Sequence, residues 1–108
     1  MKRRPPRRLH GIIYLPQIRE KNWSKHGVSE QEVLEAFSGA ALFRFQERGQ
    51  RRGEDLYTAM SQTGAGRYLV VFFIHKVGGQ ALILSARDMT ATEKRYYEAR
   101  QTGRLRQK

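Results

Sequence analysis

Hydrophobic and polar positions divide the chain into a helical first part and a strand-rich second part. A short β-rich run, Gly11–Leu15, is followed by a helical pattern over Gln17–Lys25. Pro16 suits the first turn of that helix, and Gly27 suits its left-handed C-terminus. We expect Trp23 to pack in the interior, because burial usually dominates the energetics of an aromatic side chain.

Capping boxes predict two further helices. Residues 29–32, Ser-Glu-Gln-Glu, form the first box and begin a helical pattern that ends at Phe37. Residues 90–93, Thr-Ala-Thr-Glu, form the second and begin a helix predicted over Ala91–Gln101. In such a box the hydroxyl and the carboxylate satisfy free amides of the first turn. The chain should therefore contain two short helices before residue 40 and one near its C-terminus.

From Ala41 onward the pattern changes to short apolar runs separated by glycine-rich turns. Four runs have strand character: Ala41–Gln46, Leu56–Gln62, Tyr68–Lys76 and Ala81–Arg87. Short connections suit antiparallel hairpins, so these runs should form a meander. Tyr68–Ile74 is apolar without alternation, which predicts a central strand covered on both faces. We expect an α+β protein with an antiparallel sheet of about four strands, a short N-terminal strand, two short N-terminal helices and one C-terminal helix.

The composition fits one small domain. With 108 residues, 39% of them hydrophobic, the chain can build one core but not two. We expect a basic disordered arm over 1–10, a single domain over 11–102 and a basic tail over 103–108. The absence of cysteine excludes disulfides and thiolate metal sites and fits a reducing cytoplasm. No apolar run approaches the ~18 residues that cross a bilayer, so we expect no membrane segment.

The net charge of +11 is concentrated at the two ends of the chain. Residues 1–8 carry five basic groups and residues 99–108 carry four, with no acid, which leaves 12 basic and 10 acidic residues between them. Long-range attraction to a polyanion should come mainly from the ends, whereas selective binding requires individual cations of the core. The charge favours a nucleic acid as the partner. An acidic protein partner is the alternative.

Two sequence blocks resemble the BrnT family of toxins, which share the compact fold of RelE-type ribonucleases. The first is residues 22–29, Asn-Trp-Ser-Lys-His-Gly-Val-Ser, and the second is Ser-Ala-Arg at 85–87 leading into Glu-Lys-Arg-Tyr-Tyr at 93–97. The strand at 66–73 lies between them at a compatible separation. The two blocks together are more specific than either alone, and the resemblance covers roughly residues 12–98.

The resemblance implies a toxin that cleaves mRNA on a surface of lysine, arginine and tyrosine side chains, without a metal or a cofactor. The matching residues are Lys25, His26, Arg87, Arg95 and Tyr96. It also implies a cognate antitoxin, usually a DNA-binding protein of ribbon-helix-helix type. The antitoxin would cover the active surface, and the toxin–antitoxin complex would bind operator DNA.

Several of these candidates have an alternative structural interpretation. Arg87, at a strand end, could hold phosphate oxygens with its planar guanidinium or form an ion pair with Asp88 or Glu93. His26 could transfer protons near neutral pH or end a helix favourably. Lys25 could neutralise a phosphate or remain a solvated charge.

The remaining candidates concern RNA contacts. Tyr96 and the adjacent Tyr97 could stack on a base or donate to a phosphate, but one of them must face the core, and the sequence leaves open which. Arg67, Arg51 and Arg52 are candidates for contacts with RNA, although a solvated loop is the alternative for the last two. The three histidines lack metal-ligand spacing, so no metal site is expected.

A second class of function also remains open. In the family, the first strand usually ends in Trp-Asp-Pro followed shortly by a lysine, and a later strand carries an arginine after its acidic start. At those positions this chain has Leu15, Ile18 and Leu56. The alternative to an mRNA-cleaving endoribonuclease is therefore a non-catalytic module that binds nucleic acid or protein on the same fold.

Overall fold

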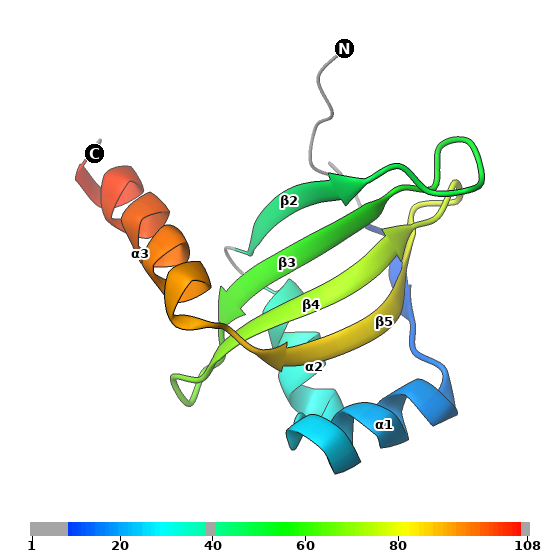
Figure 1. Cartoon of the computed structure of the whole chain (residues 1–108), viewed down its shortest axis with the longest axis horizontal. Helices are drawn as coiled ribbons and strands as arrows, with labels where there is room; N and C mark the ends of the chain where they lie inside the picture. The colour runs from blue at the N-terminus through cyan, green and yellow to red at the C-terminus, as the bar shows by residue number, and fades with distance from the viewer. Residues whose placement is uncertain (1–8, 39–40, 107–108) are drawn as a thin grey trace.

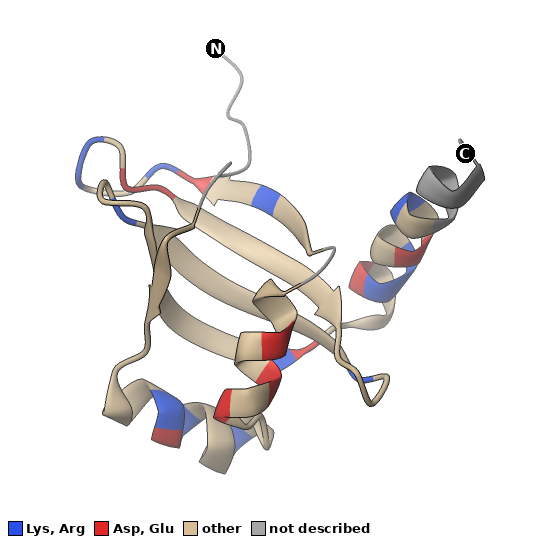
Figure 2. Cartoon of the chain, turned by 180° about the vertical axis from the view of Figure 1, so that it is seen from behind, with Lys and Arg blue, Asp and Glu red and all other residues tan. Residues whose placement is uncertain are grey.

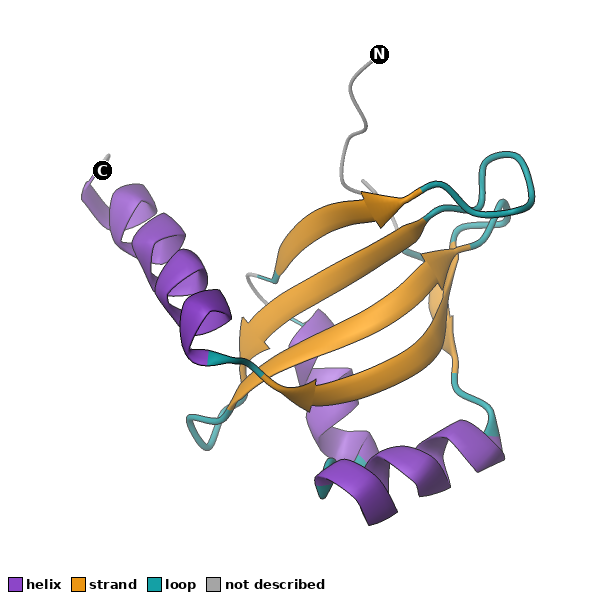
Figure 3. Cartoon of the chain, viewed as in Figure 1, coloured by secondary structure: helices purple, strands orange, loops and turns teal. Residues whose placement is uncertain are grey.

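The computed structural model describes residues 9–38 and 41–106. Within them it shows an α+β protein with one five-stranded sheet and three helices (Figure 3). In chain order the elements are β1 (Gly11–Ile13), α1 (Pro16–His26), α2 (Glu30–Phe37), β2 (Leu42–Glu47), β3 (Leu56–Gln62), β4 (Tyr68–His75), β5 (Gln80–Asp88) and α3 (Ala91–Arg106). The fold class and the order of elements expected from the sequence are confirmed.

The sheet has the strand order β1-β5-β4-β3-β2, so β2 to β5 form the expected antiparallel meander with β4 in the centre. The first strand, β1, joins β5 in parallel, with Gly11 opposite Gln80 and Ile13 opposite Leu82. A parallel pair needs a long crossover, and here α1, α2 and the rest of the meander lie between the two strands in sequence. This pairing was not predicted, since hydrophobic periodicity carries no information about strand direction.

Both expected caps of the N-terminal helices are present. Gly27 ends α1 in the left-handed conformation, with φ 62° and ψ 29°. At the start of α2 the Ser29 hydroxyl accepts from the Glu32 amide at 3.2 Å, and the Glu32 carboxylate accepts from the Ser29 amide at 2.9 Å. These two caps fix the sharp corner between the helices.

In the view of Figure 1, α2 lies behind the sheet and α1 lies below it beside β5, and the face against which these two helices pack is here termed the helix side. The main core forms between them and side chains that alternate along the strands toward the helix side. Its buried members are Val28, Val33, Ala36, Tyr57, Ala59, Leu69, Val71, Phe73, Ala81, Ile83 and Ala86. Seen from behind, α2 carries several acidic residues on its ribbon (Figure 2).

The expectation for Trp23 is wrong. Its side chain is 62% exposed, whereas the neighbouring Asn22 is completely buried. On α1 the residues that face the sheet are Ile18 and Asn22, which are four apart and therefore share one face of the helix. Trp23 is rotated by about 100° from that face and points to solvent.

The opposite face of the sheet, here termed the open face, has no helix in front of it in Figure 1. Val70 of β4 is buried there against Met60 and Tyr97, but Phe72 and Ile74 further along the strand are only half-buried. The expectation that the central strand is covered on both faces therefore holds only near its start. From the strand registers, the open face carries Leu42, Arg44, Leu56, Thr58, Met60, Val70, Phe72, Ile74 and Arg87.

The ends of the chain differ in part from the expected boundaries. Residues 1–8 of the expected arm and residues 107–108 of the expected tail lie outside the described residues. Leu9 packs against the core, and the His10 amide donates to the Gly79 carbonyl at 2.7 Å. Helix α3 continues to Arg106, five residues beyond the expected Gln101. The described body thus begins at Leu9 and extends through a longer C-terminal helix.

Candidate functional site

Arg87 lies near the end of β5 on the open face, beside the start of α3. Its guanidinium forms a two-pronged ion pair with Glu93, with Nη1–Oε1 at 2.8 Å and Nη2–Oε2 at 2.9 Å. Nη1 also donates to the Asp88 carbonyl at 3.0 Å. The ion pair with Glu93 that the sequence left open is therefore present, and it fixes the orientation of the guanidinium.

The ion pair leaves part of the Arg87 guanidinium available. Arginine has five N–H donors, and the contacts with Glu93 and Asp88 use three of them. Among the described residues no acceptor bonds to the Nε–H group or to the second Nη2–H group. These two donors lie on the same edge of the planar group, so they form a second fork that fits two phosphate oxygens.

The hydrogen bonds to Glu93 raise the pKa of Arg87, so this side chain stays charged. The same bonds lower the pKa of Glu93 from 4.5 to about 2. The Glu93 carboxylate also accepts from the Thr90 amide at 2.8 Å, and the Thr90 hydroxyl accepts from the Glu93 amide at 3.1 Å. The expected capping box of α3 is therefore present, and its carboxylate also holds Arg87.

The structure decides between the two adjacent tyrosines of α3. Tyr97 is 7% exposed and packs edge-on against Tyr68, with ring centroids 6.0 Å apart. Tyr96 remains half-buried, and the guanidinium carbon of Arg44 lies 4.1 Å from its ring centroid. Tyr96 therefore borders the same open face as Arg87.

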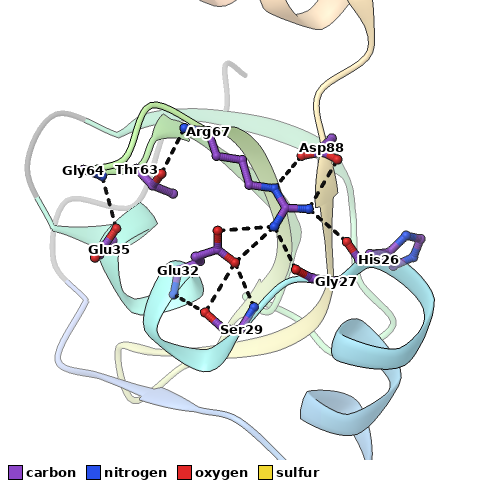
Figure 4. Close-up of polar contacts among 9 residues, drawn as sticks. All are labelled: His26, Gly27, Ser29, Glu32, Glu35, Thr63, Gly64, Arg67 and Asp88. Carbon is purple, nitrogen blue, oxygen red and sulfur yellow. Dashed lines mark hydrogen bonds and ion pairs between the residues drawn. The ribbon is translucent and has the colours of Figure 1, made fainter.

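The pair Lys25 and His26 lies at the end of α1, on the helix side. Figure 4 shows the His26 backbone carbonyl directed at Arg67, while its imidazole points away. Side chains alternate along β5, so Asp88 faces the helix side and Arg87 the open face. Lys25 and His26 therefore lie on the opposite side of the sheet from Arg87, near the same end of β5. Within the described part of the chain, neither side chain contacts Arg87.

Arg67 has a different environment from Arg87, because all five of its N–H donors have acceptors within the chain (Figure 4). Nε and Nη2 donate to the Asp88 carboxylate at 2.7 and 3.3 Å. Nη1 donates to the Glu32 carboxylate at 3.1 Å and to the Gly27 carbonyl at 2.8 Å. Nη2 also donates to the His26 carbonyl at 2.9 Å. The bonds to Asp88 raise the pKa of Arg67 and lower the pKa of Asp88. These contacts favour a structural role, joining α1, α2 and β5, over the RNA contact expected for Arg67.

The other predicted arginines are dispersed. Arg51 and Arg52 are exposed in the loop between β2 and β3, which lies at the end of the sheet opposite to α3 in Figure 1. Arg95 is exposed on α3, where its Nη2 lies 3.3 Å from the Thr92 hydroxyl. Of the candidate residues, Arg87 and Tyr96 therefore share the open face, where Arg87 lies beside Phe72 and Tyr96 beside Arg44.

Sequence reasoning missed two arginines at this face. Arg44 alternates with apolar residues along β2 and faces outward with Leu42, a signal that was available in the sequence. Arg100 follows Tyr96 by four residues on α3, and its guanidinium carbon lies 4.2 Å from the same ring centroid. Their shared contact with Tyr96 depends on the position of α3 relative to β2, which no local pattern encodes.

Two general observations complete the site. Within residues 9–38 and 41–106, no three histidine, cysteine, aspartate or glutamate side chains lie close enough together to hold a metal ion. In the same residues no helix has the length and apolar character needed to cross a bilayer.

The fold and this arrangement can be compared with known proteins. A family profile described as "Ribonuclease toxin, BrnT, of type II toxin-antitoxin system" matches residues 16–93, which is more than half of the chain. The chain belongs to the BrnT family. The match includes the first block of the BrnT resemblance, residues 22–29, and the Ser-Ala-Arg of the second block at 85–87, and it ends at Glu93. A type II BrnT toxin has an antitoxin protein as its partner.

A solved BrnT structure shares the fold. The crystal structure of the Brucella abortus ribonuclease toxin, BrnT, matches with a TM-score of 0.51 and 19% sequence identity. The match covers 74% of this BrnT-family chain and 96% of the Brucella chain. A search of curated protein sequences finds no significant match.

Proposed function

We propose that this BrnT-family toxin is an endoribonuclease that cleaves mRNA without a metal, with Arg87 holding the scissile phosphate on the open face. The observation that carries the proposal is the free fork of the Arg87 guanidinium. Glu93 fixes the group from one side at 2.8 and 2.9 Å, while Nε–H and one Nη2–H remain available. A preoriented cation of this kind stabilises the negative charge that develops on a phosphate during cleavage.

The chemistry requires the ribose 2′-hydroxyl to attack the neighbouring phosphate, with one proton removed from the hydroxyl and one delivered to the leaving oxygen. Arg87 supplies the charge stabilisation, and Tyr96, on the same face beside Arg44, supplies a ring and a hydroxyl for an RNA contact away from the scissile phosphate. His26 is our proposed acid–base group, with Lys25 as a phosphate contact. Lys25 and His26 lie on the helix side of the end of β5, whereas Arg87 lies on the open face. RNA must therefore bend over that strand end to contact all three residues.

The test is cleavage of a labelled RNA by purified protein in EDTA, with wild type, Arg87→Gln and His26→Ala side by side. We expect Arg87→Gln to reduce the cleavage rate by about 10²–10³-fold, as does the loss of a single charge-stabilising donor in other enzymes. The matched control is Arg19→Gln, since Arg19 belongs to α1 and pairs with Glu30 at 3.3 Å. Cleavage by Arg87→Gln at the wild-type rate contradicts the proposal. Wild-type cleavage that occurs without EDTA but is lost when EDTA is added also contradicts it.

The alternative function, a non-catalytic binding module, is favoured by one observation. Leu56 lies on the open face in register with Ile74, so the position at which the family usually carries an arginine contributes no charge here. In the same experiment, wild-type protein that binds RNA but does not cut it supports this alternative.

We further propose that the antitoxin is a ribbon-helix-helix protein that covers the open face, and that the complex binds operator DNA. Neutralisation requires the antitoxin to block access to Arg87, which the open face permits because no helix lies in front of it (Figure 1). The toxin would act in the cytoplasm, where mRNA is found.

A further inference from the structure

Two arginines from different elements converge on one tyrosine at the edge of the open face. The guanidinium carbons of Arg44, on β2, and Arg100, on α3, lie 4.1 and 4.2 Å from the ring centroid of Tyr96. Both arginines are exposed, and the tyrosine is half-buried. Since the two distances are 4.1 and 4.2 Å, the two guanidinium carbons are at most 8.3 Å apart (4.1 + 4.2).

These charges are not neutralised within the described part of the chain. No carboxylate there forms an ion pair with Arg44 or Arg100, whereas Arg19 and Arg87 each pair with one carboxylate and Arg67 pairs with two. A cation–π contact uses the ring quadrupole and leaves the N–H groups free to donate to oxygen. The cluster therefore presents unused donors and uncompensated charge, which favours an anionic ligand.

The cluster contains more than is needed to attach α3 to the sheet. One guanidinium, that of Arg44, links β2 to the helix through Tyr96. Arg100 lies on the same helix as Tyr96, one turn further along, so its contact joins no additional element. Buried Tyr97 and the Arg87–Glu93 ion pair already hold the start of α3. A purely structural role accounts for one of the two cations but not for both.

The strand registers connect this cluster to Arg87. Arg44 is opposite Thr58, and Thr58 is opposite Phe72, so the three residues form one row across β2, β3 and β4 on the open face. The guanidinium carbon of Arg87 lies 5.3 Å from the ring centroid of Phe72 at the end of this row. β2 and β5 are three strand spacings apart, or about 14 Å. A few nucleotides of single-stranded RNA can span that distance.

We propose that Arg44, Tyr96 and Arg100 form a second RNA subsite, which binds a backbone phosphate of single-stranded RNA a few nucleotides from the bond held by Arg87. The inference rests on the proposed ribonuclease function. Arg87 shares its charge with Glu93, so it orients a phosphate but contributes little net attraction. Arg44 and Arg100 have no such partner, so they supply the electrostatic attraction that draws RNA across the open face.

The experiment measures binding to a 2′-O-methyl oligoribonucleotide, which lacks the attacking hydroxyl and cannot be cleaved. Fluorescence anisotropy gives Kd at several KCl concentrations for a probe of about twelve nucleotides and for a trinucleotide. The variants are Arg44→Gln, Arg100→Gln and the double variant, with Arg19→Gln as the matched control. Arg100 lies on the exposed surface of α3 and does not link α3 to β2. Arg100→Gln therefore tests RNA binding without removing the contact between β2 and α3.

We expect each single substitution to weaken binding of the longer probe and to reduce the slope of log Kd against log [KCl] by about 0.7, the value for one phosphate contact on a single strand. The double variant should lose about 1.4 of the slope, and the loss of affinity should be larger for the longer probe than for the trinucleotide. Arg19→Gln should bind as wild type does.

Three other results are informative. Unchanged slopes in both single variants overturn the subsite and leave the ribonuclease proposal intact. Unchanged RNA binding with weakened antitoxin binding also overturns it, and assigns the cluster to the protein partner. Wild-type protein that binds the probe through Arg44 and Arg100 but does not cleave ordinary RNA supports the subsite and contradicts the ribonuclease proposal.

Discussion

At the scale of single residues, Asn22 shows how a residue of the BrnT block can serve the fold rather than the chemistry. Its side chain is completely buried, with Oδ1 accepting from the Ala86 amide at 3.2 Å and Nδ2 donating to the Tyr14 hydroxyl at 2.9 Å. The bond to Ala86 satisfies a backbone donor of β5 near the bulge between Phe72 and Phe73 in the β4–β5 register. Asn22 therefore ties α1 to the strand that carries Arg87.

We predict that Asn22→Ala lowers the free energy of unfolding by about 2–3 kcal/mol, because it leaves the buried Ala86 N–H group without a partner. Urea denaturation followed by circular dichroism measures the change. Ser24→Ala, on the exposed side of the same helix, is the control and should change stability by less than about 0.5 kcal/mol. Equal stability of Asn22→Ala and wild type would show that the bond contributes nothing to the fold.

At the scale of elements, the start of α3 is held by one carboxylate with two functions. Glu93 caps the helix through Thr90 and also forms the ion pair with Arg87, whose side chain is 31% exposed against 23% for Glu93. The position of α3 thus depends on the same contact that orients the proposed phosphate ligand. Glutamine at this position preserves the capping box but removes the charge.

We predict that Glu93→Gln lowers the free energy of unfolding at pH 7 by about 1.5–3 kcal/mol, the range for a hydrogen bond to a charged group. The folded pKa of Glu93 lies at about 2, below its usual value of 4.5. The contribution of the ion pair is therefore fully present above pH 4.5 and is lost as the pH falls toward 2. Urea midpoints at several pH values should show that wild type and Glu93→Gln converge in acid. A constant difference down to pH 2 would contradict this assignment.

At the scale of the whole molecule, the basic N-terminal residues are separate in sequence from the residues of the proposed RNA site. The proposed RNA contacts involve residues between Lys25 and Arg100, whereas residues 1–8 carry five basic groups. The body begins at Leu9 and His10, which are held by the core and by the Gly79 carbonyl. Removal of residues 1–8 should therefore leave the folded body and its open face intact.

We predict that deletion of residues 1–8 weakens RNA binding at low salt without changing the positions at which RNA is cut. The slope of log Kd against log [KCl] should fall by at most about 3.5, which corresponds to five phosphate contacts on a single strand. Anisotropy titrations at several KCl concentrations measure the slope, and sequencing gels locate the cuts. A changed cleavage pattern would show that the N-terminal residues take part in selecting the RNA.

Much of the element plan and part of the site could be predicted from the sequence. The capping boxes at Ser29 and Thr90, the left-handed Gly27 and the four strand runs depend on neighbouring residues, so local patterns were sufficient to predict them. Arg87 was also predictable as a candidate, because its position at a strand end before a helix cap is a local feature.

Other features were decided only by the tertiary structure, because they depend on contacts between distant segments. The exposure of Trp23 follows from which face of α1 meets the sheet, and the parallel pairing of β1 with β5 joins residues about 70 positions apart. The choice between Tyr96 and Tyr97 required the position of α3 at the end of the open face.

The arginines show most clearly what the sequence determined and what depended on the tertiary structure. The sequence determined which cations the chain contains, but a guanidinium is available to RNA only if its donors are not already used. In the folded protein Arg67 has all five donors occupied, Arg87 retains a fork of two, and Arg44 and Arg100 converge on Tyr96 without a carboxylate among the described residues. Because each of these states depends on acceptors or rings from other elements, only the assembled structure could distinguish them.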